Sequence, residues 1–310
     1  MKQIDWKTTK NKTKRFFFGM SITDGFLYKL VIYILLISFG YIYLYPILFM
    51  TMNSLMSVED LINPGVSWIP TTFEWSNYTR SFEVLEIPQA IWESTSFVFW
   101  NAAAATLSAM LIGYGFARFE FPFKKLLFTL MLATFILPQA VTLMSNVLIY
   151  TNLGIMSTKW SMLLPAMSGQ GLNAAIYILI FYSFYKTIPH VLFESAEVDG
   201  AGPLRIFFKI AIPLVLPAFL IVFLFSFVWY WNETYITPLF TGGNITLPTK
   251  LIAFQNSYET LFPPDSPGNE LNEAIRLAGN MITILPLLVL YFIAQRYFVE
   301  SIDRSGITGE

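Results

Sequence analysis

Six long apolar segments, separated by shorter polar stretches, dominate the pattern along this chain. They cover about residues 27–50, 93–116, 124–150, 160–185, 206–231 and 276–298. Each is long enough for the roughly 20 apolar residues that a helix needs to cross a bilayer. Because hydrocarbon offers no hydrogen-bond partners, each segment must satisfy its own backbone as a helix. The pattern therefore predicts six transmembrane helices, the first of which is too long for a cleaved signal peptide.

Composition excludes a water-soluble globule. Hydrophobic residues make up 55% of the chain and charged residues 13%, whereas soluble domains carry about 25% charged residues. The chain has no cysteine and a single histidine, which argues against disulfides, thiolate metal sites and multi-histidine clusters. We expect no metal site, and the net charge of −1 gives no indication of nucleic acid binding.

Positive charge alternates from one connection to the next. Basic residues gather in the N-terminal arm, in the connection after the second segment and in the connection after the fourth: Lys2, Lys7, Lys10, Lys12, Lys14 and Arg15; Arg118, Lys124 and Lys125; Lys186, Arg205 and Lys209. The connections 51–92 and 232–275 are acidic on balance. Since positive loops stay in the cytoplasm, both termini are predicted to be cytoplasmic, as six spans require.

The polar stretch 186–211 predicts a helix, a sharp corner and a second helix. Pro189 suits the first turn of a helix over about 189–199. Gly200 is able to adopt the left-handed conformation that ends a helix, and Pro203 begins the next one. From these residues alone, a solvated connection between two spans and a docking element for a soluble partner are equal alternatives.

The run ESAEVDGAGPLRIFFKIAIPLVLP resembles the EAA loop in permease subunits of ATP-binding-cassette (ABC) importers. That pattern reads E-A-A-x-x-D-G-A, then an apolar and basic stretch, then I-x-L-P. The matching positions are Glu194, Ala196, Asp199, Gly200, Ala201, Ile212 and Pro213, and Ser195 replaces the usual alanine. The resemblance favours the docking element over the solvated connection.

Further motifs resemble the carbohydrate-uptake, maltose-type group of these permeases. They are Leu137-Pro138, Asn152-Leu-Gly154 with Thr158, Leu164-Pro165, Trp231-Asn232-Glu233 with Pro238-Leu239, and the ending 295–302. The likeness covers about 27–309. The tail lacks the usual glycine at 300–301, and this departure blurs the substrate subgroup.

The resemblance implies an all-α membrane protein with the type I ABC importer permease fold, six transmembrane helices and a cytoplasmic coupling helix. It implies that Glu194, Ser195, Ala196, Asp199, Gly200 and Ala201 contact a cytoplasmic ABC ATPase dimer. The other implied partners are a second homologous permease, an extracytoplasmic substrate-binding protein and membrane lipid. The chain has no G-x-x-x-x-G-K-[ST] phosphate loop, so we expect no cofactor on it, no enzymatic activity, and ATP and Mg²⁺ on the partner.

The expected organisation is a basic cytoplasmic arm (1–26), one permease domain (27–298) with its coupling loop at 186–211, and a cytoplasmic tail (299–310). The expected location is a bacterial plasma membrane. The expected function is to form, with a second permease, the path for a sugar or oligosaccharide. A permease for a non-sugar solute is an alternative. An ion-coupled transporter is another, but the sequence does not clearly show the mid-membrane ionisable residues and repeats that it requires.

Polar and aromatic side chains inside the spans are candidates for the substrate path, because an unpaired polar group in hydrocarbon is unfavourable. They are Asn101, Gln139, Asn146, Gln170, Asn173, Trp231 and Asn232. Amides and aromatic rings suit the hydroxyls and ring faces of a neutral sugar. Helix–helix hydrogen bonding is the alternative for the amides, and anchoring at the membrane interface is the alternative for Trp231. The glycines at 169 and 171 predict a kink or an unwound turn in the fourth span.

Overall fold

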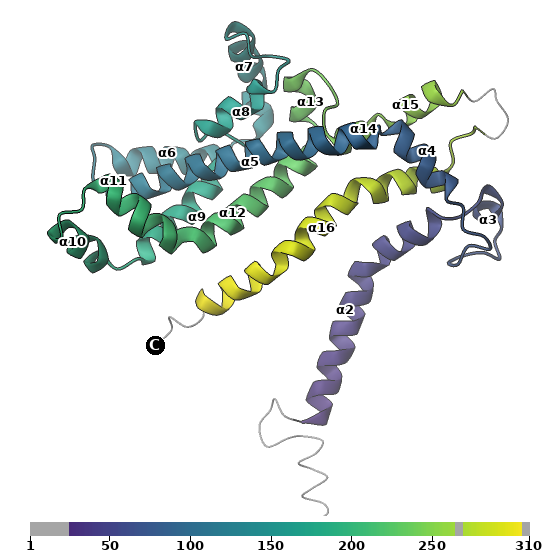
Figure 1. Cartoon of the computed structure of the whole chain (residues 1–310), viewed down its shortest axis with the longest axis horizontal. Coiled ribbons are helices and arrows are strands. Elements are labelled where there is room, and N and C mark those ends of the chain that lie inside the picture. Colours follow the sequence, from purple (N-terminus) through teal and green to yellow (C-terminus); the bar gives the residue numbers. More distant parts are fainter. Residues whose placement is uncertain (1–24, 264–268, 306–310) are drawn as a thin grey trace, which may run out of the picture. The chain divides into compact units, whose positions relative to one another are not determined.

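The structure is a computed structural model that describes residues 25–263 and 269–305. The predicted basic arm therefore lies, apart from its last two residues, outside the described residues, as do 264–268 and 306–310. The helices are α2 (Phe26–Asn53), α3 (Val58–Ile62), α4 (Ser76–Val84), α5 (Ile87–Arg118), α6 (Lys124–Ile136), α7 (Gln139–Asn152), α8 (Trp160–Met167), α9 (Ala174–Thr187), α10 (His190–Val198), α11 (Pro203–Ile206), α12 (Ile212–Asn232), α13 (Ile236–Thr241), α14 (Leu247–Ile252), α15 (Phe254–Leu261) and α16 (Glu273–Ser305). Figure 1 shows this all-helical chain.

The chain divides into two compact units, one made of 25–78 with 272–281 and the other of the remaining described residues. In the first unit, α2 is apolar on all sides, as expected for a membrane helix. The connection after α2 is ordered by polar side chains. Asn77 Nδ2 donates to the carbonyl oxygens of Ser54 (3.0 Å) and Met56 (2.9 Å). The Thr71 hydroxyl donates to the Asp60 carboxylate at 2.7 Å.

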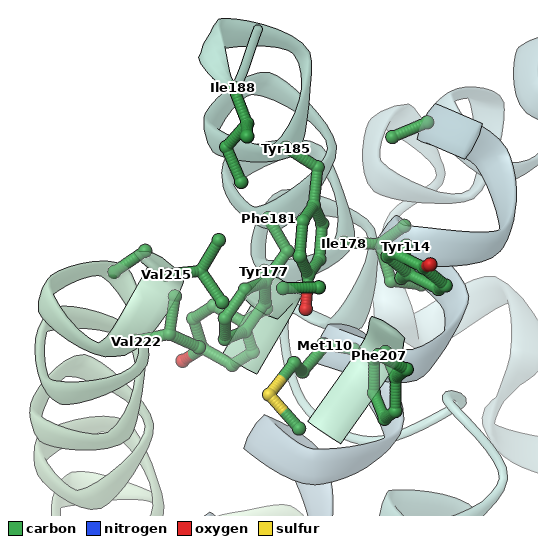
Figure 2. Packing of buried hydrophobic residues seen from close by; sticks show 14 of the residues in the cluster. Met110, Tyr114, Tyr177, Ile178, Phe181, Tyr185, Ile188, Phe207, Val215 and Val222 are labelled. Atoms are coloured by element: carbon green, nitrogen blue, oxygen red, sulfur yellow. The ribbon is translucent and has the colours of Figure 1, made fainter. Parts of the chain in front are cut away.

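In the second unit, α5, α9 and α12 pack together around one apolar core. Figure 2 shows Tyr114, Tyr185 and Phe207 meeting within that core. Small residues on α5 permit the close approach. Ala102 and Ala105 are buried, in agreement with the use of small residues at helix contacts in membranes. A Cβ on Gly113 would lie 2.7 Å from Phe181 Cβ, so only glycine lets α5 and α9 approach this closely.

The third and fourth predicted spans are each interrupted, the third at a position that the sequence analysis did not predict and the fourth at the predicted glycines. α6 and α7 are bent by 104° at Leu137-Pro138. Proline lacks an N–H and disfavours helical backbone in the residue before it, and Leu137 is accordingly extended. In the fourth span, α8 ends at Met167 and α9 begins at Ala174. The glycine prediction is confirmed there as an unwound segment at 168–173.

Within residues 25–263 and 269–305, four uninterrupted helical stretches are long and apolar enough to cross a membrane: α2, α5, the α11–α12 stretch and α16. Two bent pairs, α6–α7 and α9–α10, satisfy the same test when each pair is taken together. The prediction of an all-helical membrane protein is therefore confirmed. α16 continues to Ser305, so its helix extends beyond the predicted end of the sixth span at 298.

The fifth span contains a wider π-helical turn, Phe207–Ala211, between α11 and α12. Its cause is local. Pro213 lies two residues beyond the turn, and a proline ring clashes with the carbonyl four residues earlier in a regular α-helix, which here is the carbonyl of Lys209 within the turn. The π turn lets one helix run from Pro203 to Asn232 despite Pro213, with Arg205 and Lys209 near its beginning.

Candidate functional site

The corner between α10 and α11 has the geometry that its glycine predicts. Gly200 has a φ of +75°, the left-handed conformation that L-residues avoid. The Gly200 N–H donates to Glu197 O (3.0 Å) and the Ala201 N–H to Ala196 O (2.9 Å). These two bonds form a Schellman motif, which satisfies carbonyls at the end of a helix. The beginning differs slightly from expectation, since Pro189 precedes α10 as its N-cap and does not lie in its first turn.

One face of α10 is fixed to the helical core. Phe193 is 1% exposed and belongs to the core cluster of α5, α9 and α12. The guanidinium carbon of Arg118, the last residue of α5, lies 3.6 Å from the centre of the Phe193 ring. Arg118 Nη1 is 3.1 Å from Nδ1 of His190 at the start of α10. Movement of α10 would therefore be transmitted directly to α5.

The opposite face of α10 is open to solvent. Glu194, Ser195 and Asp199 are exposed. The carboxylates of Glu194 and Asp199 have no hydrogen bond or ion pair with any residue that the structure describes. The Ser195 hydroxyl donates to Val191 O within α10 at 2.6 Å, so it is not directed at a partner. The exposed carboxylates on this face of α10 are therefore available for contact with another protein.

Three of the predicted coupling residues, Ala196, Asp199 and Ala201, surround a hollow of about 240 Å³. Arg205 and Lys209 complete its charged lining. Neither cation is in an ion pair among the described residues. The corner thus presents a small, charged depression beside an exposed helix, which suits a protruding side chain of a docking protein.

The unwound segment 168–173 is held in place by α12. The Leu172 N–H donates to the Tyr230 hydroxyl at 3.2 Å, and Tyr230 is fully buried. A Cβ on Gly171 would lie 2.6 Å from that hydroxyl oxygen, so glycine is required for the approach. Gln170 is exposed and Asn173 half-buried on this segment, and Asn173 takes a left-handed φ of +55°.

The remaining path candidates are dispersed. Asn101 is 2% exposed, its Nδ2 donates to Phe97 O at 2.8 Å, and its Oδ1 has no partner among the described residues. Trp231 is buried and stacked on Phe227. Gln139 and Asn232 are exposed, and Asn146 is half-buried. The structure therefore brings Gln170 and Asn173 together on one segment and places Asn101 and Trp231 inside the helical packing.

Comparison with known proteins identifies the family. Residues 105–304, well over half of the chain, match the family described as binding-protein-dependent transport system inner membrane component. The chain belongs to this family. It is consequently a multi-pass transport permease, and the family resemblance seen in its EAA-like loop is confirmed.

Individual relatives of this permease cover nearly its whole length. The osmoprotective compounds uptake permease protein GgtD of Synechocystis sp. is 29% identical, over 90% of this chain and 92% of its own. The polygalacturonan/rhamnogalacturonan transport system permease protein YtcP of Bacillus subtilis is 27% identical, over 91% and 99%. The diacetylchitobiose uptake system permease protein NgcG of Streptomyces coelicolor is 26% identical, over 87% and 86%.

A solved structure shares the fold. It is the crystal structure of a bacterial ABC transporter involved in the import of the acidic polysaccharide alginate. The match has a TM-score of 0.65 and 19% identity, and covers 88% of this permease and 96% of that chain. The predicted type I importer fold is confirmed by this similarity.

Two functional features of the permease escaped sequence reasoning. Arg118 was read only as a loop charge, although it joins α5 to α10. Glu233 was read only as part of a motif, yet its carboxylate accepts the N–H groups of Tyr235 (2.9 Å), Ile236 (2.7 Å) and Thr237. The Glu233 carboxylate therefore caps the N-terminus of α13. An acidic residue just before a Pro-containing helix is a sequence signal for such a cap.

Proposed function

We propose that α10 is the element through which a cytoplasmic ABC ATPase dimer drives this permease. The observation that carries the proposal is that α10 is fixed to the helical core on one face and exposed on the other. Phe193 and Arg118 tie one face to α5, while Glu194, Ser195 and Asp199 on the other face are exposed. A helix arranged in this way transmits an external push to the membrane core without unfolding.

Each residue of the corner has a separate role in this proposal. Glu194 and Asp199 accept hydrogen bonds or charge pairs from the ATPase. Ser195 and Ala196 are small enough for a groove to close over α10. Gly200 and Ala201 form the Schellman corner that sets the angle between α10 and α11.

The energy source in this proposal is ATP with Mg²⁺ on the partner. The permease has no phosphate-binding loop motif of its own and acts as a transporter subunit without enzymatic activity. Its charge pattern supports placing both termini and the α10–α11 corner in the cytoplasm of a bacterial cell. The acidic outer loop 232–275, which contains the Glu233-capped α13, would then face the extracytoplasmic binding protein.

We infer that the cargo is a sugar or oligosaccharide and that a second, homologous permease completes the path. Relatives named for diacetylchitobiose and for polygalacturonan or rhamnogalacturonan uptake support this class. Gln170 and Asn173 are the preferred path residues, because unwound segments of broken membrane helices form substrate sites in other transporters. Gln139, Asn146 and Asn232 are secondary candidates, while Asn101 and Trp231 would shape the path from behind.

The experiment is extraction of the chain from its native membrane in mild detergent, followed by mass spectrometry of the proteins that co-purify. Recovery of an ATPase, a second permease and a binding protein is the expected result, and the ligand of that binding protein identifies the cargo. If the chain is recovered alone and moves solute into vesicles without ATP, the proposal is wrong and an ion-coupled mechanism replaces it.

A further inference from the structure

A cavity of about 660 Å³ opens at the turn between α5 and α6. It is separate from the α10–α11 corner and is lined by residues of that turn, of the first residues of α6 and of the last part of α9. All of these lie at the ends of the spans that the proposed orientation assigns to the cytoplasm. In that orientation, the cavity would lie at the depth of the lipid head groups.

The charge in this cavity is strongly positive. Lys124, Lys125 and Lys186 line it together with one acidic residue, Glu120. The Lys124 ammonium is already engaged, with Glu120 Oε1 at 2.7 Å and Phe119 O at 2.9 Å. Lys125 and Lys186 form no hydrogen bond or ion pair with any residue that the structure describes. Two positive charges therefore remain uncompensated within one hollow.

The pKa of Glu120 reflects the same group of positive charges. The Lys124 ammonium, through its hydrogen bond and its charge, holds the pKa of this carboxyl below its usual value, and the charges of Lys186 and Lys125 lower the pKa further. The three ammonium groups thus lie close enough together to act on the same carboxyl.

The rim of the cavity is apolar on the side of α6. Phe123 is 77% exposed and Leu126 is 55% exposed. Tyr182 forms part of the wall, with the Lys186 ammonium 5.8 Å from the centre of its ring. The cavity therefore combines positively charged lysines, which attract an anion, with exposed apolar side chains at the beginning of α6.

We propose that this cavity binds the phosphate head group of an anionic phospholipid, with its acyl chains lying along the exposed side chains of α6. Basic pockets at the cytoplasmic ends of membrane helices recognise such head groups. A free phosphate would use the lysines but would leave Phe123 and Leu126 exposed to water. An acidic segment of a partner protein would do the same, which is why the apolar edge favours lipid.

The test is native mass spectrometry of the full chain, purified with its partners, during titration with phosphatidylglycerol or with phosphatidylcholine of the same acyl chains. We expect tighter retention of phosphatidylglycerol. The double variant Lys125→Gln/Lys186→Gln should weaken that retention about 25-fold, because one basic residue near an anionic lipid contributes roughly a fivefold factor. The conservative pair Lys125→Arg/Lys186→Arg should retain the affinity. Phosphatidylcholine binding should not change in either variant.

A matched control distinguishes a specific lipid-binding site from general attraction between anionic lipid and a basic protein. Lys29→Gln/Lys159→Gln removes the same net charge from positions outside the cavity and outside the hollow at the α10–α11 corner, and should leave phosphatidylglycerol retention unchanged. Equal weakening by both double variants would overturn the proposal. Displacement of the lipid by equimolar inorganic phosphate would assign the site to a soluble anion instead. Loss of the lipid only when the ATPase is bound would assign the cavity to that protein. Unchanged thermal unfolding of each variant confirms that folding is preserved.

Discussion

Substitution of Gly200 tests whether the backbone conformation of the α10–α11 corner is needed for coupling, without changing the acidic side chains of α10. The φ of Gly200 is +75°, and a Cβ added to it would meet nothing within 4 Å. The space is therefore open to a side chain, and only the backbone conformation resists one. A series of Gly200→Asn, Gly200→Ala and Gly200→Pro changes the strain in steps at one exposed site.

The expected magnitudes follow from that geometry. Alanine in the left-handed region costs about 1–2 kcal/mol, while asparagine visits this region more readily. Proline locks φ near −65° and removes the N–H that donates to Glu197 O, so the corner cannot form. Since about 1.4 kcal/mol is a tenfold change in an equilibrium constant, the alanine variant should lose roughly five- to thirtyfold in the population of the native corner. The asparagine variant should lose less.

The assay is the amount of ATPase that co-purifies per permease, together with binding-protein-stimulated ATP hydrolysis by the reconstituted transporter. Membrane insertion should be unchanged in all three variants, because Gly200 lies outside the apolar spans. Coupling should fall in the order asparagine, alanine, proline. Normal coupling in Gly200→Pro would refute the role assigned to the corner. Equal loss in asparagine and alanine would contradict the role given to backbone strain, because asparagine adopts the left-handed region more readily, and would indicate that any side chain at position 200 interferes.

Three further predictions concern other parts of the permease. Gly171→Ala places a Cβ 2.6 Å from the Tyr230 hydroxyl oxygen and should destabilise by about 1–3 kcal/mol. Gly115→Ala, inside α5 with nothing within 4 Å, should not lower the thermal unfolding temperature and should raise stability by about 0.5–1 kcal/mol. Glu233→Ala removes the cap of α13 and should cost about 0.5–2 kcal/mol, measurable as faster proteolysis of the loop that follows α12; an unchanged rate would contradict the capping role. The pKa of Asp60 is lowered, chiefly by the hydrogen bond from the Thr71 hydroxyl, from 3.8. Its contribution is therefore present at neutral pH and lost as the pH falls through the folded-state pKa below 3.8. The protection factor of the Thr71 amide, which donates to Asp60, should therefore fall there relative to the intrinsic exchange rate at each pH, and Asp60→Asn should abolish that pH dependence.

The apolar runs and the EAA-like stretch are local properties, and they predicted correctly an all-helical membrane permease with a glycine corner after α10. Span length, loop charge and a left-handed glycine each depend on a few consecutive residues. These features are therefore readable without knowledge of the neighbours. The position of the break in the fourth span was also predicted, from the glycines at 169 and 171, whereas Leu137-Pro138 was interpreted only as a family motif.

Only the tertiary structure determined the direction and extent of bending at those breaks. A proline or glycine permits a helix to bend, but the direction and extent depend on which distant group satisfies the released backbone, as Tyr230 does for Leu172. The contact between Arg118 and Phe193 joins α5 to α10 across a large sequence separation, and no periodic pattern marks it. Burial of Asn101 and Trp231 was likewise unpredictable, because a helix that is apolar on all sides does not reveal which of its faces meets another helix and which meets lipid.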